Sequence, residues 1–150
     1  MSLTFSEARD QIQTLFNVPW LADTPAITGT APPVEWDNLE PLVPSAAPWA
    51  RANVAHEGGG QDSLSGGLGT SRFLRTGTFT VSIYTVLGTG TVISDALAKV
   101  VMDTMEGNTT ADGLVWFRNI QLNEVGPDPD KDPLWYKVDV IAEFEYDEIK

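Results

Sequence analysis

The histidine and serines near the middle of the chain are the first residues whose types could support catalysis. His56 with Glu57 could form a general base and its orienting carboxylate, and Ser63, Ser65 or Ser71 could serve as a nucleophile. Adjacent residues of a strand point to opposite faces, and a flexible loop does not hold a nucleophile within hydrogen-bond distance of a base. This pattern therefore speaks against a serine–histidine site.

Three aspartates near the C-terminus have the spacing of a calcium-binding loop. Asp128, Asp130 and Asp132 match positions one, three and five, and Asp139 falls at position twelve. The sixth position, where a glycine permits the sharp turn, is Pro133, and Asp139 belongs to the alternating pattern of the following strand. A solvent-exposed turn between two strands is the favoured interpretation. We predict no metal site, no cofactor and no enzymatic activity.

The segment 56–71 contains six glycines, which invites comparison with phosphate-binding loops. No lysine follows the glycines, and the segment leads into a strand, whereas phosphate-binding loops lead into a helix. Its only large apolar residues are Leu64 and Leu68, so it buries too little surface to order itself. We expect a mobile loop, and we interpret 58–70, which begins with Gly58, Gly59 and Gly60, as a docking arm.

Composition narrows the function classes further. The 150 residues (16.3 kDa) suit one domain, 1–150, with a sizeable core. The absence of cysteine excludes disulfides and thiolate metal sites, and a single histidine excludes multi-histidine centres. The apolar run Val138–Ala142 is interrupted by Asp139, so we expect no membrane span, and the N-terminus does not resemble a secretory signal. We therefore expect a protein assembled in a cytoplasm.

The net charge of −12 disfavours broad binding to nucleic acid phosphates. Segments 1–50, 51–119 and 120–150 hold six, six and nine acids against one, five and three bases. An acidic surface can nevertheless line a channel through which DNA passes without sticking.

Two helices are expected. Thr4 and Glu7 form a capping-box pattern, followed by apolar residues at helical spacing until Pro19, which we expect to end the first helix. A second helix is predicted over 91–106 and ends at Gly107. Seven of the ten prolines lie in 19–48, which we interpret as an extended segment that wraps the domain and contains a short strand at Val34–Trp36.

The remaining segments are typical of strands, which we expect at 49–55, 73–86, 114–125 and 136–146. In the last of these, apolar and polar residues alternate, whereas in 114–125 the expected core contacts are Trp116, Ile120 and Leu122. Both helices need a sheet face to cover. The predicted fold is therefore α+β, with two helices on one face of a mostly antiparallel or mixed sheet and a long glycine-rich loop.

Four arginines have two open interpretations. Arg51, Arg72, Arg75 and Arg118 could contact other subunits, or they could balance neighbouring acids on the surface. Arg75 shares a strand face with Phe79, and Arg118 follows Trp116 and Phe117, so both guanidinium groups are suited to stacking on a ring.

An ordered set of segments resembles the tail terminator-like proteins of long-tailed bacteriophages. The set is Trp49–Val54, Arg72–Gly77, Val115–Asn119, Val125–Asp128, Trp135–Tyr136 and Ala142–Asp147. The resemblance implies an α+β subunit of the virion that closes into a ring, six-fold in relatives. It implies that the ring caps the tail tube, ends tube polymerisation and offers a surface to the head–tail connector or stopper, while DNA passes through its bore.

Two alternatives stay open. A head-completion, connector or tail tube protein of the same particle would have similar physical properties. A small-molecule-binding or enzymatic α+β domain would instead require a pocket with perturbed titratable groups.

Overall fold

The computed structural model describes residues 3–37, 39, 47–61, 71–110, 113–127 and 135–149. Within them, the chain forms a long helix, a short helix, three strands, another long helix and two final strands. The elements are α1 (Phe5–Asp23), α2 (Pro25–Thr28), β1 (Val34–Trp36), β2 (Trp49–Gln61), β3 (Arg72–Val86), α3 (Val92–Met105), β4 (Val115–Pro127) and β5 (Trp135–Ile149).

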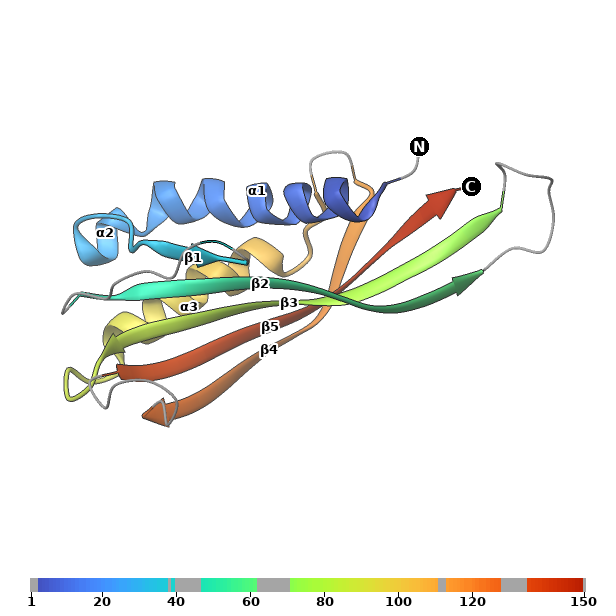
Figure 1. The fold of residues 1–150 in the computed structure, drawn as a ribbon. Coiled ribbons are helices and arrows are strands. Elements are labelled where there is room, and N and C mark those ends of the chain that lie inside the picture. Colours follow the sequence, from blue (N-terminus) through green and yellow to red (C-terminus); the bar gives the residue numbers. More distant parts are fainter. Residues whose placement is uncertain are drawn as a thin grey trace.

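The five strands form one mixed sheet in the order β1-β2-β3-β5-β4. β1 runs parallel to β2, whereas the other three pairings are antiparallel. α1 and α3 lie on the same side of the sheet (Figure 1). This two-layer α+β arrangement confirms the predicted fold class. Among the described residues no helix lies on the opposite side of the sheet, hereafter the open face.

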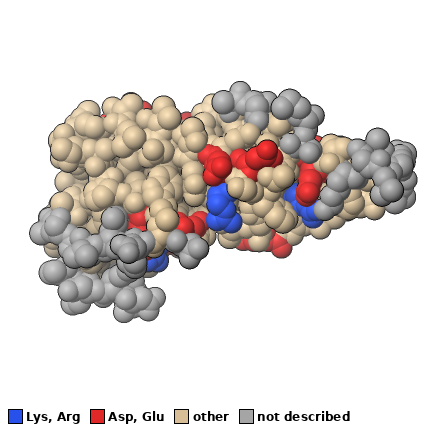
Figure 2. Space-filling model, turned by 45° about the horizontal axis from the view of Figure 1, so that its top comes forward, with Lys and Arg blue, Asp and Glu red and all other residues tan. Residues whose placement is uncertain are grey.

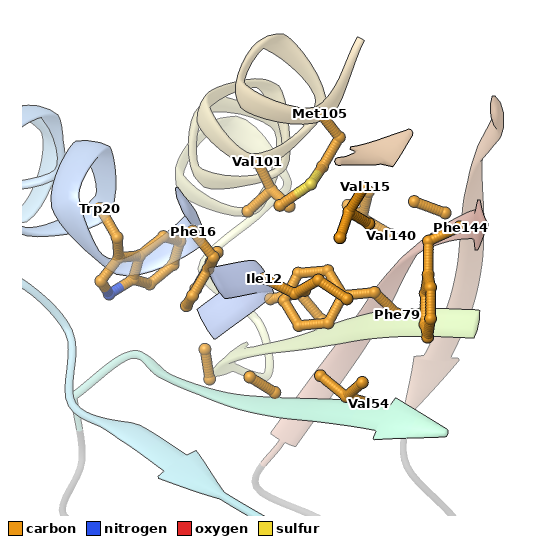
Figure 3. Close-up of a cluster of buried hydrophobic side chains, with 14 of the residues drawn as sticks. Ile12, Phe16, Trp20, Val54, Phe79, Val101, Met105, Val115, Val140 and Phe144 are labelled. Carbon is orange, nitrogen blue, oxygen red and sulfur yellow. The ribbon is translucent and has the colours of Figure 1, made fainter. Parts of the chain in front are cut away.

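The core lies between the two helices and the sheet. Ile12, Phe16 and Trp20 of α1 point toward the strands, and α3 contributes Val101 and Met105 (Figure 3). Alternate residues of the strands meet them, as the period-two patterns of β3 and β5 predicted. The buried strand residues include Val54, Phe79, Val81, Ile83, Val115, Val138, Val140, Ala142 and Phe144.

The first helix is longer than predicted. Its N-terminus has the expected capping box, because the Glu7 amide donates to the Thr4 hydroxyl and the Thr4 amide to the Glu7 carboxylate. Pro19 does not end it but lies inside α1. The next residue, Trp20, is fully buried, and its indole N–H donates to the carbonyl of Pro32 at 2.9 Å. Burial of this ring stabilises the last turn against the cost of proline.

The proline-rich segment is accordingly less extended than predicted. Its first residues complete α1 and form α2, and the short strand expected at Val34–Trp36 is confirmed as β1. Of the rest, residue 38 and 40–46 lie outside the described residues.

The glycine-rich segment was wrongly placed in a loop at its beginning. β2 continues through Gly58, Gly59 and Gly60 to Gln61, paired with the first residues of β3. A bulge between His56 and Gly58 shifts the register once. Ala55–Gln61, Arg72–Thr78 and Glu143–Ile149 of β5 thus form a three-stranded arm that extends past the N-terminal end of α1 (Figure 1). Residues 62–70, with Leu64 and Leu68, lie outside the described residues.

The expected core face of the fourth strand was wrong for Trp116, whereas Ile120 is partly buried against the core, as expected. Trp116 and Leu122 are 41% and 42% exposed, whereas Val115 is buried. A bulge between Arg118 and Gln121, where Asn119 has a φ of 52°, resets the alternation along β4. An unbroken period of two therefore assigns the wrong face to Trp116, and Leu122 lies beside α3 at the rim of the core.

Candidate assembly surface

Three of the four candidate arginines lie on the open face. Arg51 alternates with the buried residues Ala50 and Ala52, so its side chain points away from the helices. The same alternation places Arg72 of β3 on the open face, and Arg118 is paired there with Glu143 of β5. The structure thus brings residues from three strands onto one polar surface.

Each of these arginines forms an ion pair within the chain. Arg51 is 2.9 Å from Glu35, Arg72 is 2.8 Å from Asp147, and Arg118 is 3.3 Å from Glu145. On the face drawn in Figure 2, the blue groups likewise lie beside red ones. Such half-exposed pairs contribute about 0–1 kcal/mol each to stability. Their geometry matches the interpretation of cations that balance neighbouring acids.

Arg75 lies apart from the others, on the helix side of the sheet where the arm leaves the body. Its guanidinium carbon is 5.6 Å from the centre of the Phe5 ring and 5.4 Å from that of Phe73, and its Nε donates to Glu148 at 2.8 Å. The predicted stacking of Arg75 on aromatic rings is therefore confirmed. These contacts connect the first residue of α1 to the arm.

His56 lies in the same region, which we call the arm root: Phe5, His56, Phe73, Arg75, Phe144, Tyr146 and Glu148. Its ring centre is 4.8 Å from that of Phe5, 5.5 Å from that of Phe144 and 5.8 Å from that of Tyr146. Burial, together with the positive charge of Arg9, lowers the pKa of His56. Burial also raises the pKa of Tyr146 to about 12. Sequence reasoning missed this cluster because its members are distant in the chain.

A glycine is required where the arm joins the body. Gly77 is paired with His56 on one side and with Phe144 on the other, and a Cβ at Gly77 would overlap the Ala55 carbonyl and the Phe144 ring. Gly59 has a φ of 131° and also lies against the backbone of β3. Gly60, in contrast, has open space around it.

Both edges of the sheet are partly open in the described part of the chain. On one edge, β1 covers β2 only as far as Ala52, and the Asp37 carboxylate accepts the next inter-strand hydrogen bond, from the Val54 amide at 2.7 Å. Among the residues that the structure describes, no strand neighbours the β2 segment 55–60 on that side.

On the other edge, Thr109 bridges to Trp116 at the start of β4. The remainder, 118–127, has no outer strand among the described residues. Leu122 and Val125 on this part are 42% and 40% exposed. Exposed strand edges of this kind are sites for pairing with another chain.

The open face also contains an aromatic cluster that the sequence patterns did not predict. The rings of Trp49 and Tyr84 stack at 4.1 Å, and Trp135 meets Trp49 edge-on at 6.1 Å. All three are buried and form a second, smaller apolar cluster. The sequence shows that each of these aromatic residues lies on the face opposite the core residues of its strand. Which of them contact one another depends on the strand register.

Surface grooves adjoin α1 in the described part of the chain. One, of about 620 Å³, lies between α1 and α3 beside Leu15 and Lys99. Another, of about 430 Å³, lies beside Val18 and Thr109, and a third, of about 300 Å³, lies beside Trp36.

The shifted pKa values of His56 and Tyr146 belong to the arm root and not to any of these grooves. In the ranges that the structure describes, no group of three acidic or histidine side chains could hold a metal ion. No helix there is long and apolar enough to cross a membrane.

Comparison with known proteins shows a shared fold. No family model and no curated protein sequence matches this chain. Seventeen solved chains match it in structure. One, whose title states no activity, is 22% identical with a TM-score of 0.57 and covers 95% of each chain. Another, titled as the virion of a native gene transfer agent particle, is 17% identical with a TM-score of 0.61, covering 96% of this chain and 99% of the other.

Proposed function

We propose that this protein is a structural subunit of a phage or phage-like virion, and that it closes into a ring that terminates the tail tube. The observation that carries the proposal is the structural likeness, over nearly the whole of both chains, to a chain from a gene transfer agent virion. The ordered motifs that resemble tail terminator-like proteins support the finer assignment. In this proposal the protein is not an enzyme and acts within the virion, by shape and self-association.

The geometry supports ring formation in two ways. A ring needs contacts between two different flanks of the subunit, and the open edges of β2 and β4 lie on opposite flanks of the sheet. The arm extends beyond the helices and is held at a defined position by Arg75 and Phe5, so it can reach a neighbouring subunit or the tube. The proposed partners are further copies of this chain, the tail tube protein and the head–tail connector.

Capping of tail tubes tests the proposed function. Purified protein is added to tubes of the particle's own tube protein, and tube ends are viewed by negative-stain microscopy. We expect rings at one end of each tube and no further elongation when tube protein is added. Elongation past the bound protein would indicate a tube subunit, and binding to isolated connectors alone would indicate a head-completion role.

A shortened arm provides the matched variant. Replacing 62–70 by Asn-Gly leaves a short hairpin connection between the paired residues Gln61 and Phe73. We expect the thermal midpoint to change little and tube capping to be lost. Capping at the wild-type level by this variant would show that the arm tip does not dock on the tube.

A further inference from the structure

We propose that neighbouring copies of this chain join edge to edge, with the open half of β4 pairing antiparallel to the arm half of β2 in the next copy. This inference rests on the proposed ring and specifies its contact. β2 is antiparallel to β3, β3 to β5 and β5 to β4, so β4 runs antiparallel to β2 across one sheet. A neighbour in the same orientation therefore presents β2 to β4 in the antiparallel sense.

The two open segments lie at different levels along the strands. Leu122, near the middle of the open part of β4, is level with Val140, Val81 and Ala52. In the neighbour, Ala52 is covered by β1, and the open segment 55–60 of β2 is centred near Gly58, which is level with Thr76. Thr76 is five positions along β3 from Val81. Adjacent copies must therefore be staggered along the strand direction.

Side-chain alternation and the length of β1 select the stagger. Side chains alternate between the two faces of a strand, so only a shift by an even number of residues keeps the helix side of one copy's sheet continuous with that of the next. A shift of about four residues would bring Pro127 level with the neighbour's Ala52, where Trp36 already pairs. A shift of six brings Pro127 level with Val54, whose amide donates to Asp37, so that the new pairing begins with Gly126 level with Ala55, beyond the end of β1. The edge of β2 is then covered by β1 and β4 placed end to end.

The stagger agrees with the geometry of a closed sheet. Six residues correspond to about 20 Å along the strands, and the four strands from β2 to β4 span about 19 Å across them. The ratio of the stagger to the sheet width is the tangent of the strand tilt relative to the ring axis. The tilt is therefore about 45°, at the upper end of the range found in closed barrels. Six such copies would form a circle about 50 Å across at the backbone.

The direction of the stagger assigns the lumen. Figure 1 shows the strands from β1 to β4 with α3 behind them, so that the viewer faces the open side of the sheet. In closed sheets the strands coil around the axis in a right-handed sense, which follows from strand twist. Copies joined with this shift have that handedness only when the open face is turned toward the ring axis. The helices then lie outside. Among the described strand residues, the charged side chains of the open face are Glu35, Arg51, Glu57, Arg72, Arg118, Lys137, Asp139, Glu143, Glu145 and Asp147, and the acids among them are in excess.

Cysteine pairs test this contact cleanly, because the chain contains no cysteine. The proposed register places Gly60 of one copy opposite Gln121 of the next, and Gly58 opposite Asn123. Two double variants, Gly60→Cys with Gln121→Cys and Gly58→Cys with Asn123→Cys, are each assembled on tubes and oxidised. Exchanging the partners, Gly60→Cys with Asn123→Cys and Gly58→Cys with Gln121→Cys, gives matched controls in which the Cβ atoms lie on a diagonal about 7–8 Å apart.

For the two in-register pairs, we expect a ladder of disulfide-linked oligomers on a non-reducing gel, ending at the closed ring. For the controls, we expect at least ten-fold less cross-linked product. Within one copy the paired positions lie on opposite edges of the sheet, so a ladder reports contact between copies. Capped tubes without a ladder, or a ladder from Gly60→Cys with Arg118→Cys, which reports the four-residue shift, would overturn this contact and leave the proposed function intact. Wild-type protein that does not cap tubes would overturn both.

Discussion

At the root of the arm, the guanidinium of Arg75 lies between the rings of Phe5 and Phe73 and is paired with Glu148. Its side chain is only 18% exposed, so this arginine is better shielded from solvent than the three paired arginines of the open face. Phe5 is the first residue of α1, directly after the capping box at Thr4. These contacts give the arm a fixed direction relative to the helix layer.

The depressed pKa of His56 makes the stability of this region depend on pH. The folded protein binds a proton at His56 less readily than the unfolded chain, whose histidine has a pKa near 6.5. The stability associated with neutral His56 is therefore present above this value and is lost as the pH falls toward the lower pKa of the folded state. Arg9 is the charged group that acts on His56, whereas Arg75 and Glu148 act on the neighbouring Tyr146.

We expect the urea midpoint of the wild type to fall between pH 7.5 and 5.5, and to fall less in His56→Phe, which keeps the aromatic contacts. Equilibrium urea unfolding followed by tryptophan fluorescence at both pH values measures the difference. Equal pH dependence of the two proteins would show that His56 does not titrate differently on folding.

Among the elements, the long pairing of β2 with β3 carries the arm beyond the helix layer. Its register passes through the row His56, Gly77, Phe144 and Phe117, which crosses four strands. The Phe144 ring occupies the space that a side chain at Gly77 would need. The arm is thus continuous with the core sheet through β2, β3 and β5, and Gly77 and Phe144 pack together where it begins.

Substitution at Gly77 should weaken this junction. We expect Gly77→Ala to lower the free energy of unfolding by about 1–3 kcal/mol, because the added methyl group overlaps the Ala55 carbonyl and the Phe144 ring. Gly60→Ala lies on the same arm in open space and should change stability by less than about 0.5 kcal/mol. Urea unfolding of both variants measures the contrast, and equal losses would argue against the tight packing at Gly77.

For the whole molecule, charge opposes self-association. Each copy carries a net charge of −12, so copies repel one another at low ionic strength. The stretch 11–34, which covers most of α1 and reaches β1, contains Asp23 as its only charged residue. A broad uncharged area is visible over this part of the molecule in Figure 2. Acidic groups are therefore concentrated elsewhere, including on the open face.

Salt should promote ring formation by the free protein. Raising NaCl from 50 to 500 mM shortens the screening length to about 4 Å, which weakens repulsion between copies more than it weakens apolar or backbone contacts. We expect the protein concentration at half-assembly, measured by mass photometry, to fall several-fold. Weaker assembly at high salt would instead show that ion pairs between copies dominate the contact.

Much of the fold could be predicted because its signals are local. The Thr4–Glu7 capping box, the apolar face of α3 and the alternation of β5 each arise from residues close together in the chain. The helix N-terminus, the short strand Val34–Trp36 and the two-layer arrangement were predicted on this basis. The two helices required a sheet to cover, and the strands supplied it.

The errors arose where distant contacts override local preference. Burial of Trp20 carries α1 past Pro19, pairing with β3 keeps the glycines of β2 in a strand, and the bulge at Asn119 resets the faces of β4. Only the tertiary structure determined which edges of the sheet stay open and which arginines share its open face. Sequence alone determined the composition, charge, helix starts and strand alternation, since these depend on near neighbours, whereas register and edge exposure depend on residues that only the folded chain brings together.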